Sequence, residues 1–215
     1  MMNNNLTDQM KSLYSVYNNV VKPLIAEIEV RYEVFPTAIF NEIRAFNDHI
    51  ARCYLKPDDI QWVDGQINKA EGHIERIVLD CYKFLNVSLY DKIIKKFDKS
   101  YKGVDLSCIN NGEFIMKHKT LTKDIIKILK KAKSKESEED KSEAISLYQC
   151  AHNKYTELED LIDDNCRNLF WAKGKFYTNK IWKGFLWLLS AIISGIISSC
   201  IVPYDRFIEL LHSLF

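Results

Sequence analysis

Hydrophobic residues recur along residues 39 to 53 at the spacing of one face of an α-helix. Ile39, Ile43, Phe46, Ile50 and Cys53 follow one another at steps of four, three, four and three residues. This spacing gathers them into a single stripe on a helix of 3.6 residues per turn. The pattern predicts an amphipathic helix with one buried face.

The same spacing and its interruptions predict a succession of helices. A first helix is expected over about residues 6–34, bent near Pro23, and Pro36 then starts the helix that carries the stripe. That helix ends at Lys56-Pro57-Asp58-Asp59, and irregular chain is expected over residues 100–119. Further helices are predicted over 60–85, 121–132 and 142–171. Helices joined by short turns pack antiparallel, so the expected fold class is an all-α antiparallel bundle.

One long apolar run lies near the C-terminus. The 19 residues from Gly184 to Val202 carry no charge, and about 20 apolar residues span the hydrocarbon of a bilayer. We therefore expect a cytosolic helical bundle over residues 1–175, a transmembrane helix over 181–203 and a short amphipathic tail over 204–215. A buried core helix is the alternative interpretation of the run.

The charges beside this run predict its orientation. Lys173, Lys175, Lys180 and Lys183 precede it, whereas Arg206 follows it. Because basic residues favour the cytoplasmic side of a membrane, the bulk of the chain is expected in the cytoplasm. The predicted localisation is the inner (plasma) membrane, crossed once.

The amino-acid composition limits the kinds of fold and site that the chain can form. Of 215 residues, 47% are hydrophobic, and Gly and Pro number only seven and four, which suits long helices. A net charge of +1 argues against a protein that coats nucleic acid non-specifically. The six cysteines form no C-x-x-C pair and no histidine lies near them at zinc-finger spacing. No cofactor and no metal site is predicted.

The predicted helix after Pro36 carries Arg44 and His49, five residues apart. At about 100° per residue the two side chains lie about 140° apart around the helix. Asp48 falls on the exposed side with Arg44, and Glu42 lies two turns before His49 on its flank. Glu42 can orient the imidazole only if another group closes that gap. A composite site therefore requires a second helix or a second subunit.

The segment Pro36-Thr-Ala-Ile-Phe-Asn-Glu-Ile-Arg-Ala-Phe-Asn-Asp-His49, with its Arg-x-x-x-x-His spacing, resembles the HEPN superfamily of small all-α proteins. Residues 69–76 and 79–83 resemble the second helix of such proteins. The resemblance, over residues 6–170, implies a helical bundle that cleaves RNA without a metal and pairs its motifs across a homodimer. Many members act in toxin–antitoxin, CRISPR and antiviral systems. The chain departs from the family at Ala45, where members usually carry a polar residue.

These side chains suit RNA cleavage by the 2′-hydroxyl of the RNA itself. His49 is the expected general acid or base, and Arg44 the expected clamp on the phosphate. The alternative is a solvated face on which Arg44 pairs with Asp48, with His49 at the edge of the packing between helices.

Further polar residues share a face of the next predicted helix. This face carries His73, Arg76, Asp80 and Lys83. Together they are expected to help hold phosphate, or Asp80 to orient His73, and the alternative is a plain solvated face. The segments His49-Ile-Ala-Arg52 and His73-Ile-Glu-Arg76 echo each other. We interpret that echo as chance.

The leading hypothesis is a membrane-anchored HEPN-like ribonuclease or toxin-type effector in bacterial antiviral defence. Its expected partners are RNA, the membrane, further copies of itself as a homodimer or higher oligomer, and a defence-system protein. One alternative is a non-catalytic oligomeric membrane effector similar to CRISPR accessory membrane proteins. Another is a helical interaction module. Whether the chain is an enzyme stays open at this stage.

Overall fold

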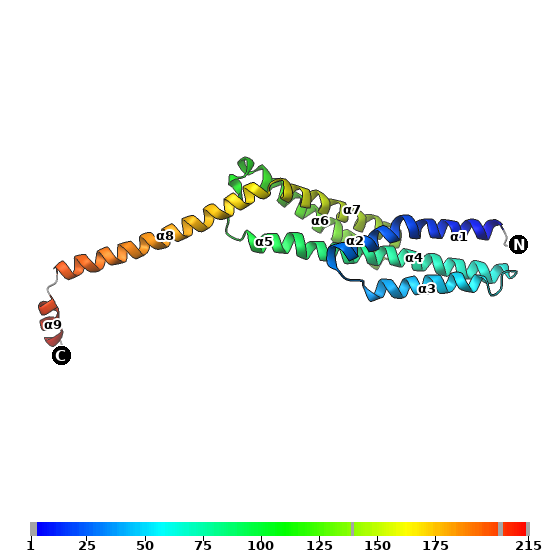
Figure 1. Cartoon of the computed structure of the whole chain (residues 1–215), viewed down its shortest axis with the longest axis horizontal. Coiled ribbons are helices and arrows are strands. Elements are labelled where there is room, and N and C mark those ends of the chain that lie inside the picture. Colours follow the sequence, from blue (N-terminus) through cyan, green and yellow to red (C-terminus); the bar gives the residue numbers. More distant parts are fainter. Residues whose placement is uncertain (1–3, 139, 202–203, 214–215) are drawn as a thin grey trace. The chain divides into compact units, whose positions relative to one another are not determined.

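The computed structural model describes residues 4–138, 140–201 and 204–213, and nearly all of them are helical, with no strand in those ranges. The predicted all-α class is confirmed (Figure 1). The chain divides into two compact units. The first comprises Met1–Ser100 and Met116–Asp163, and the second comprises Tyr101–Ile115 and Asp164–Phe215.

The first unit begins with a helix that passes through its proline. Helix α1 (Asn4–Val16) continues through a wide π turn, η1 (Tyr17–Val21), into α2 (Lys22–Tyr32). Pro23 has no N–H to give to the carbonyl four residues before it. The wide turn changes the register just ahead of it, because the Lys22 N–H donates to the Tyr17 carbonyl, five residues back. The predicted bend near Pro23 is thus a π turn within a continuous helix.

Helices α3 (Thr37–Cys53) and α4 (Ile60–Leu89) form an antiparallel hairpin, as predicted (Figure 1). Pro36 occupies the N-cap position of α3, and the Asp59 carboxylate caps α4 by accepting from the Trp62 N–H at 3.0 Å. The predicted stripe on α3 faces the core. Four of its members are at most 5% exposed, and the fifth, Ile43, packs against them partly buried.

After α4 the chain passes through η2 (Tyr90–Lys95) and α5 (Lys96–Ser100), and later returns as the hairpin of α6 (Glu113–Ser137) and α7 (Lys141–Asp164). Helix α6 starts earlier and ends later than the predicted 121–132, so the irregular chain expected over 100–119 is wrong for residues 113–119, which belong to this helix. Helices α1 to α4 share one apolar core with Ala132, Ala144 and Tyr148 of the hairpin. A second cluster joins the end of α4 and η2 to α6 and α7 through Leu89, Ile93, Ile94, Ile125, Tyr155 and Leu158.

The second unit holds two short turns, η3 (Leu106–Cys108) and η4 (Asn110–Gly112), and helices α8 (Cys166–Ile201) and α9 (Tyr204–His212). The single helix predicted over 142–171 is wrong, because α7 ends at Asp164 and α8 begins at Cys166. Asp163-Asp164-Asn165 explains the break, since short polar side chains compete for backbone hydrogen bonds and favour caps and turns. The Asn165 carbonyl accepts from Leu169 N–H at 2.9 Å, and its side-chain oxygen accepts from Asn110 Nδ2 at 3.2 Å.

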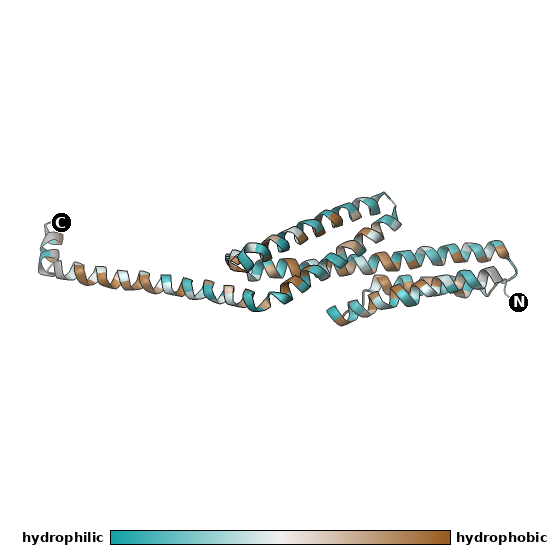
Figure 2. Cartoon of the chain, turned by 90° about the horizontal axis from the view of Figure 1, so that it is seen from above, coloured by the Kyte–Doolittle hydropathy of each residue, from teal (hydrophilic) through white to brown (hydrophobic). Residues whose placement is uncertain are grey.

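Within α8, the stretch Cys166–Ser199 contains a window long and apolar enough to cross a membrane, and none of that window is buried. Brown and pale residues predominate along it in Figure 2. Residues 202–203 of the predicted span and residues 214–215 of the predicted tail lie outside the described residues. The described part of the tail is helix α9, as its amphipathic spacing predicted.

Candidate active site

Two histidines from α3 and α4 stack on each other in the first unit. The ring centroids of His49 and His73 lie 5.2 Å apart, and the ring planes differ by 20°. The antiparallel hairpin brings these positions together because α4 returns alongside α3. The two segments that echo each other in the sequence therefore meet at their histidines.

A polar side chain holds the Nδ1 atom of each ring. His49 Nδ1 lies 2.8 Å from Gln66 Oε1, and His73 Nδ1 lies 2.6 Å from Glu42 Oε2. Both partners are acceptors, so each Nδ1 carries the hydrogen and donates it. Within the part of the chain that the structure describes, no hydrogen bond engages Nε2 of either ring. Proton exchange with a ligand would therefore use Nε2.

The two acceptors differ in charge, and this difference separates the two histidines chemically. Gln66 is 3% exposed and offers a neutral amide oxygen to Nδ1 of His49. Glu42 offers a carboxylate oxygen to Nδ1 of His73. The Arg76 guanidinium lies 3.7 Å from the same Glu42 oxygen, with its side chain half exposed.

The other residues predicted for the site on α3 do not form the contacts expected of them. Arg44 is exposed and forms no ion pair among the described residues, and Asp48 pairs with Arg52 at 2.8 Å rather than with Arg44. Glu42 contacts His73 and not His49, the ring it was expected to orient.

Asp80 likewise is not the residue that orients His73. Its carboxylate lies 3.8 Å from Lys83 Nζ. Burial raises the pKa of Asp80, although the Lys83 charge opposes that shift.

The sequence reasoning missed Gln66, yet a signal was present. Gln66 lies in a stretch of α4 whose neighbours Val63, Ile67 and Ala70 are buried, and it precedes His73 by seven residues. Seven residues are close to two turns, so Gln66 and His73 share a flank of the helix. An amide within an apolar stripe needs a hydrogen-bond partner. Here the partner is the imidazole of the neighbouring helix.

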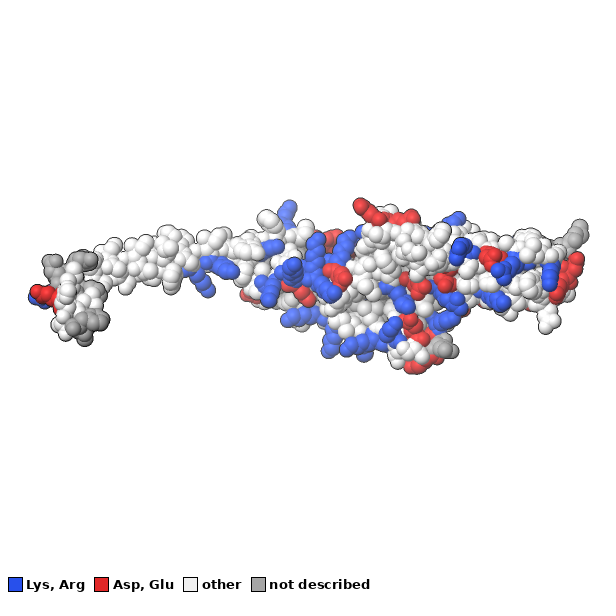
Figure 3. Space-filling view, turned by 90° about the horizontal axis from the view of Figure 1, so that it is seen from below, with Lys and Arg blue, Asp and Glu red and all other residues white. Residues whose placement is uncertain are grey.

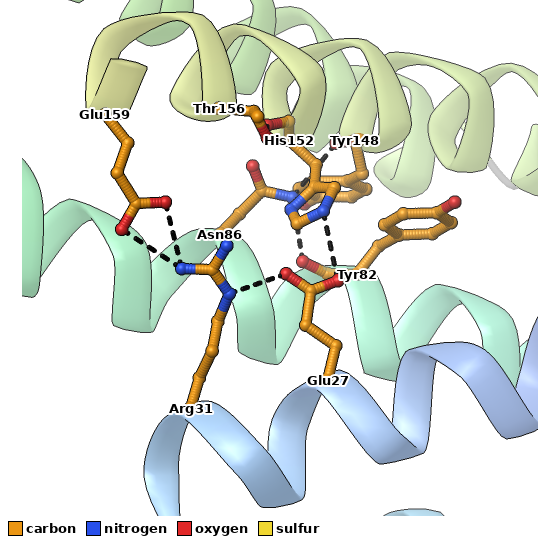
Figure 4. Close-up of polar contacts among 8 residues, drawn as sticks. All are labelled: Glu27, Arg31, Tyr82, Asn86, Tyr148, His152, Thr156 and Glu159. Atoms are coloured by element: carbon orange, nitrogen blue, oxygen red, sulfur yellow. Dashed lines mark hydrogen bonds and ion pairs between the residues drawn. The ribbon is translucent and has the colours of Figure 1, made fainter. Parts of the chain in front are cut away.

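A second polar cluster, also missed, joins α2 to α7 (Figure 4). Glu27 contacts Arg31 Nε at 2.8 Å and His152 Nε2 at 3.3 Å. Arg31 Nη1 also donates to both oxygens of Glu159. The signal was the spacing, since Glu27 and Arg31 are four residues apart and His152 and Glu159 seven. These groups pair with one another, so the cluster holds the helices together.

Beside these two clusters, the Asn86 amide of α4 donates to the carbonyls of Tyr82 and Tyr148 at 2.8 and 3.0 Å. It thereby ties α4 to α7 within the apolar core (Figure 4). Among the described residues, no group of three or more His, Cys, Asp or Glu side chains is placed to hold a metal ion.

The histidine pair is the arrangement in the first unit that best suits proton transfer. Two imidazoles in contact, each fixed through Nδ1 by a different acceptor, place two groups suited to proton transfer side by side. Comparisons of the chain with models of known protein families, with curated proteins and with solved structures each find no match.

Proposed function

We propose that the chain is a membrane-anchored ribonuclease that cleaves RNA without a metal ion, with His49 and His73 as its proton-transferring residues. The single observation that carries the proposal is the stacked pair at 5.2 Å, with Nδ1 of each ring held by its own acceptor. The HEPN-like Arg-x-x-x-x-His spacing on α3 supports it. A role in bacterial antiviral defence belongs to the same proposal.

In this reaction the 2′-hydroxyl of the RNA attacks the neighbouring phosphorus, and the 5′-oxygen of the next nucleotide leaves. Nε2 of His49, whose Nδ1 is held by Gln66, would accept the 2′-hydroxyl proton. Nε2 of His73, whose Nδ1 is held by Glu42, would give a proton to the leaving oxygen. The products are a 2′,3′-cyclic phosphate and a free 5′-hydroxyl, and water later restores the protonation states.

The developing charge on the phosphate requires a cation, and two arginines are candidates. Arg76 lies beside Glu42 in the same chain. Arg44 is exposed on a different face of α3 from His49, so it would serve a second copy of the chain. A homodimer would thus place Arg44 of one copy at the histidines of the other, as the resemblance implies.

The test uses full-length protein in detergent, with chelator present, and RNA carrying a 5′ label. The wild type is expected to give fragments that end in a 2′,3′-cyclic phosphate. His49→Asn or His73→Asn should lower the rate about 10²–10⁴-fold, and Glu42→Gln about 10–100-fold. Arg52→Ala, on the same exposed face as Arg44, is the matched control and should keep the wild-type rate. Cleavage that persists unchanged in both histidine variants would refute the proposal.

A mixing experiment separates the two arginines. If the site is shared between copies, Arg44→Ala and His49→Asn chains are each inactive, and their mixture recovers about a quarter of the activity because half of the dimers keep one complete site. If Arg76 serves within one chain, Arg76→Ala is inactive and mixing restores nothing.

A second candidate function rests on the C-terminal helices. An unburied apolar window in α8, followed by the amphipathic α9, would suit a non-catalytic effector that assembles in the membrane and perturbs it. In that case the chain would be toxic to cells because it dissipates the membrane potential. Both effects would survive His49→Asn and would disappear when the residues after 180 are removed.

A further inference from the structure

A pocket of about 450 Å³ lies within the second unit, between the turn around Gly103 and one face of α8. The α8 residues that line it follow the spacing of a buried stripe, beginning at Ala172. The lining residues of α8 are Ala172, Lys175, Phe176, Asn179, Lys180 and Lys183. Of these six, only Ala172 and Phe176 are apolar.

A close backbone approach makes the apolar floor of this pocket. Gly103 has φ +81°, the left-handed region, which glycine adopts without strain. A Cβ atom at this position would lie 3.6 Å from a ring carbon of Phe176. The turn therefore rests against the aromatic ring, and the lysines form the wall on the α8 side.

The wall carries positive charge that no carboxylate pairs within the described ranges. Lys175, Lys180 and Lys183 are exposed and form no ion pair there. Lys175 Nζ lies 5.0 Å from the centre of the Trp171 ring. The carboxylate in the described lining is that of Asp105, which accepts from Ser107 N–H at 3.0 Å and Ser107 Oγ at 2.6 Å. These two hydrogen bonds, more than the nearby Lys175 charge, lower the pKa of Asp105. Three cations against one carboxylate leave a site for an anion.

The position of the pocket along α8 favours a lipid as the source of that anion. Lys183 directly precedes the uncharged run, and Lys180 lies about 6 Å before Gly184 along the axis. The headgroup layer of each leaflet is about 5–8 Å deep, so both residues would lie within that layer if the hydrocarbon begins at Gly184. In Figure 3, Lys and Arg side chains lie along α8 up to its white, uncharged stretch. Lys175 lies about 14 Å before Gly184 along the helix axis, so it would contact the part of a headgroup that extends into water.

We propose that this pocket binds the headgroup of an anionic phospholipid, with Lys180 and Lys183 at the phosphodiester. The acyl chains would then follow the apolar surface of α8 beyond Gly184. Trp182 and Trp187 flank this boundary, where aromatic side chains favour the bilayer interface. The inference rests on the membrane anchorage proposed above and is independent of RNA cleavage.

The test titrates full-length protein in an uncharged detergent with short-chain phosphatidylglycerol and follows tryptophan fluorescence. Saturable binding is expected, with much weaker binding of short-chain phosphatidylcholine. Each lysine near an anionic headgroup contributes about fivefold in affinity, so Lys175→Gln/Lys180→Gln/Lys183→Gln should weaken binding on the order of 100-fold at low salt. The corresponding triple Lys→Arg variant keeps the charge and should bind as the wild type does.

Lys119→Gln/Lys123→Gln/Lys127→Gln is the matched control, because it removes the same charge from exposed positions of α6. It should bind phosphatidylglycerol unchanged. Equal affinity in the wild type and in the α8 triple Gln variant would overturn the proposal. So would competition by sn-glycerol 3-phosphate at the concentration at which the lipid binds, since the site would then recognise a free phosphate. Circular dichroism reports folding of each variant, and alkaline extraction of wild-type membranes reports anchorage separately.

Discussion

Arg31 Nη1 lies 3.1 and 3.0 Å from the two carboxylate oxygens of Glu159, a residue 128 positions later in the chain. The contact joins α2 to α7, and the Nε atom of the same guanidinium pairs with Glu27. Burial alone would lower the pKa of Arg31, but the hydrogen bond and charge of Glu159 and the charge of Glu27 raise it. The guanidinium is therefore the cation that keeps two carboxylates together.

Arg31→Ala should destabilise the first unit, because it leaves Glu27 and Glu159 facing each other without their shared cation. The side chains are about three-quarters buried, so the expected loss in the free energy of unfolding is about 2 kcal/mol, between values for exposed and buried pairs. Urea unfolding followed by circular dichroism measures it. Arg52→Ala, which breaks the more exposed pair with Asp48, is the control and should change little. Equal losses in the two variants would show that Arg31 contributes no more than a surface charge.

Glu136 of α6 accepts from Lys83 at 2.8 Å, Lys133 at 3.2 Å and Tyr148 at 3.1 Å. Burial alone would raise the pKa of Glu136, but these hydrogen bonds outweigh it and lower the pKa. Burial and the bond to Glu136 raise the pKa of Tyr148 to about 12. Glu136→Gln should lower the free energy of unfolding by about 1–2 kcal/mol at pH 7, where the carboxylate is charged.

The pH dependence of that loss follows from the direction of the shift. A lowered pKa in the folded state means that the contribution of Glu136 is complete above about pH 4.5 and is lost as the pH falls through the folded value. Wild type and Glu136→Gln should therefore converge in stability toward pH 3. Glu157→Gln, at a more exposed pair with Lys154, serves as the control. A difference that stays constant down to pH 3 would contradict this account.

His118 of α6 is 4% exposed and stacks on Phe97 at 4.2 Å. Burial lowers the pKa of His118, although the Asp98 charge opposes the shift. The folded state therefore prefers the neutral ring, and the unfolded chain binds the extra proton first. The stability of the first unit should decrease as the pH falls from about 6.5 toward the lower folded pKa.

His118→Gln should flatten that decrease, because an amide does not titrate in this range. Chemical unfolding at pH 7.5 and 5.5 measures the difference, with His212→Gln in the exposed tail as the control that keeps the wild-type slope. Parallel slopes in wild type and His118→Gln would assign the pH dependence to other groups.

Charge within the apolar run of α8 should prevent membrane insertion. Ile193→Arg/Ile196→Arg places two arginines near the middle of the run. Together they should make insertion of the helix into a membrane less favourable by about 5–7 kcal/mol. Alkaline carbonate extraction should release this variant from membranes and leave the wild type in the pellet. Thr178→Arg, which lies before the run, should stay in the membrane. Retention of the double variant would show that another part of the chain attaches the protein.

Helical spacing predicted α3 well. The stripe from Ile39 to Cys53 faces the core, and Asp59 caps α4, because both depend on local periodicity and turn chemistry. The partner of Glu42 was not predictable in this way. Which side chain on α4 lies opposite Glu42 depends on how the two helices slide and rotate against each other, and the local spacing of one helix does not specify that. The same reason explains why His73, and not His49, contacts Glu42.

The break at Asn165 was missed because apolar spacing continues on both sides of it. Buried Leu158 and Leu169 flank the break, so periodicity alone predicted one helix. The run Asp163-Asp164-Asn165 carried the contrary signal, since these side chains favour caps. The helix therefore ends where these capping side chains lie, although the apolar spacing continues.

Helix α8 has 36 residues, is about 54 Å long, and contains both the lysine wall and residues 184–201 of the apolar run. Because the two segments share one helix, a rotation of the apolar part about the helix axis would turn Lys180 and Lys183 with it. Successive residues differ by about 100° around that axis, so a rotation of this size would carry the lysines away from the turn at Gly103. A headgroup held between that turn and the lysines would therefore oppose such a rotation.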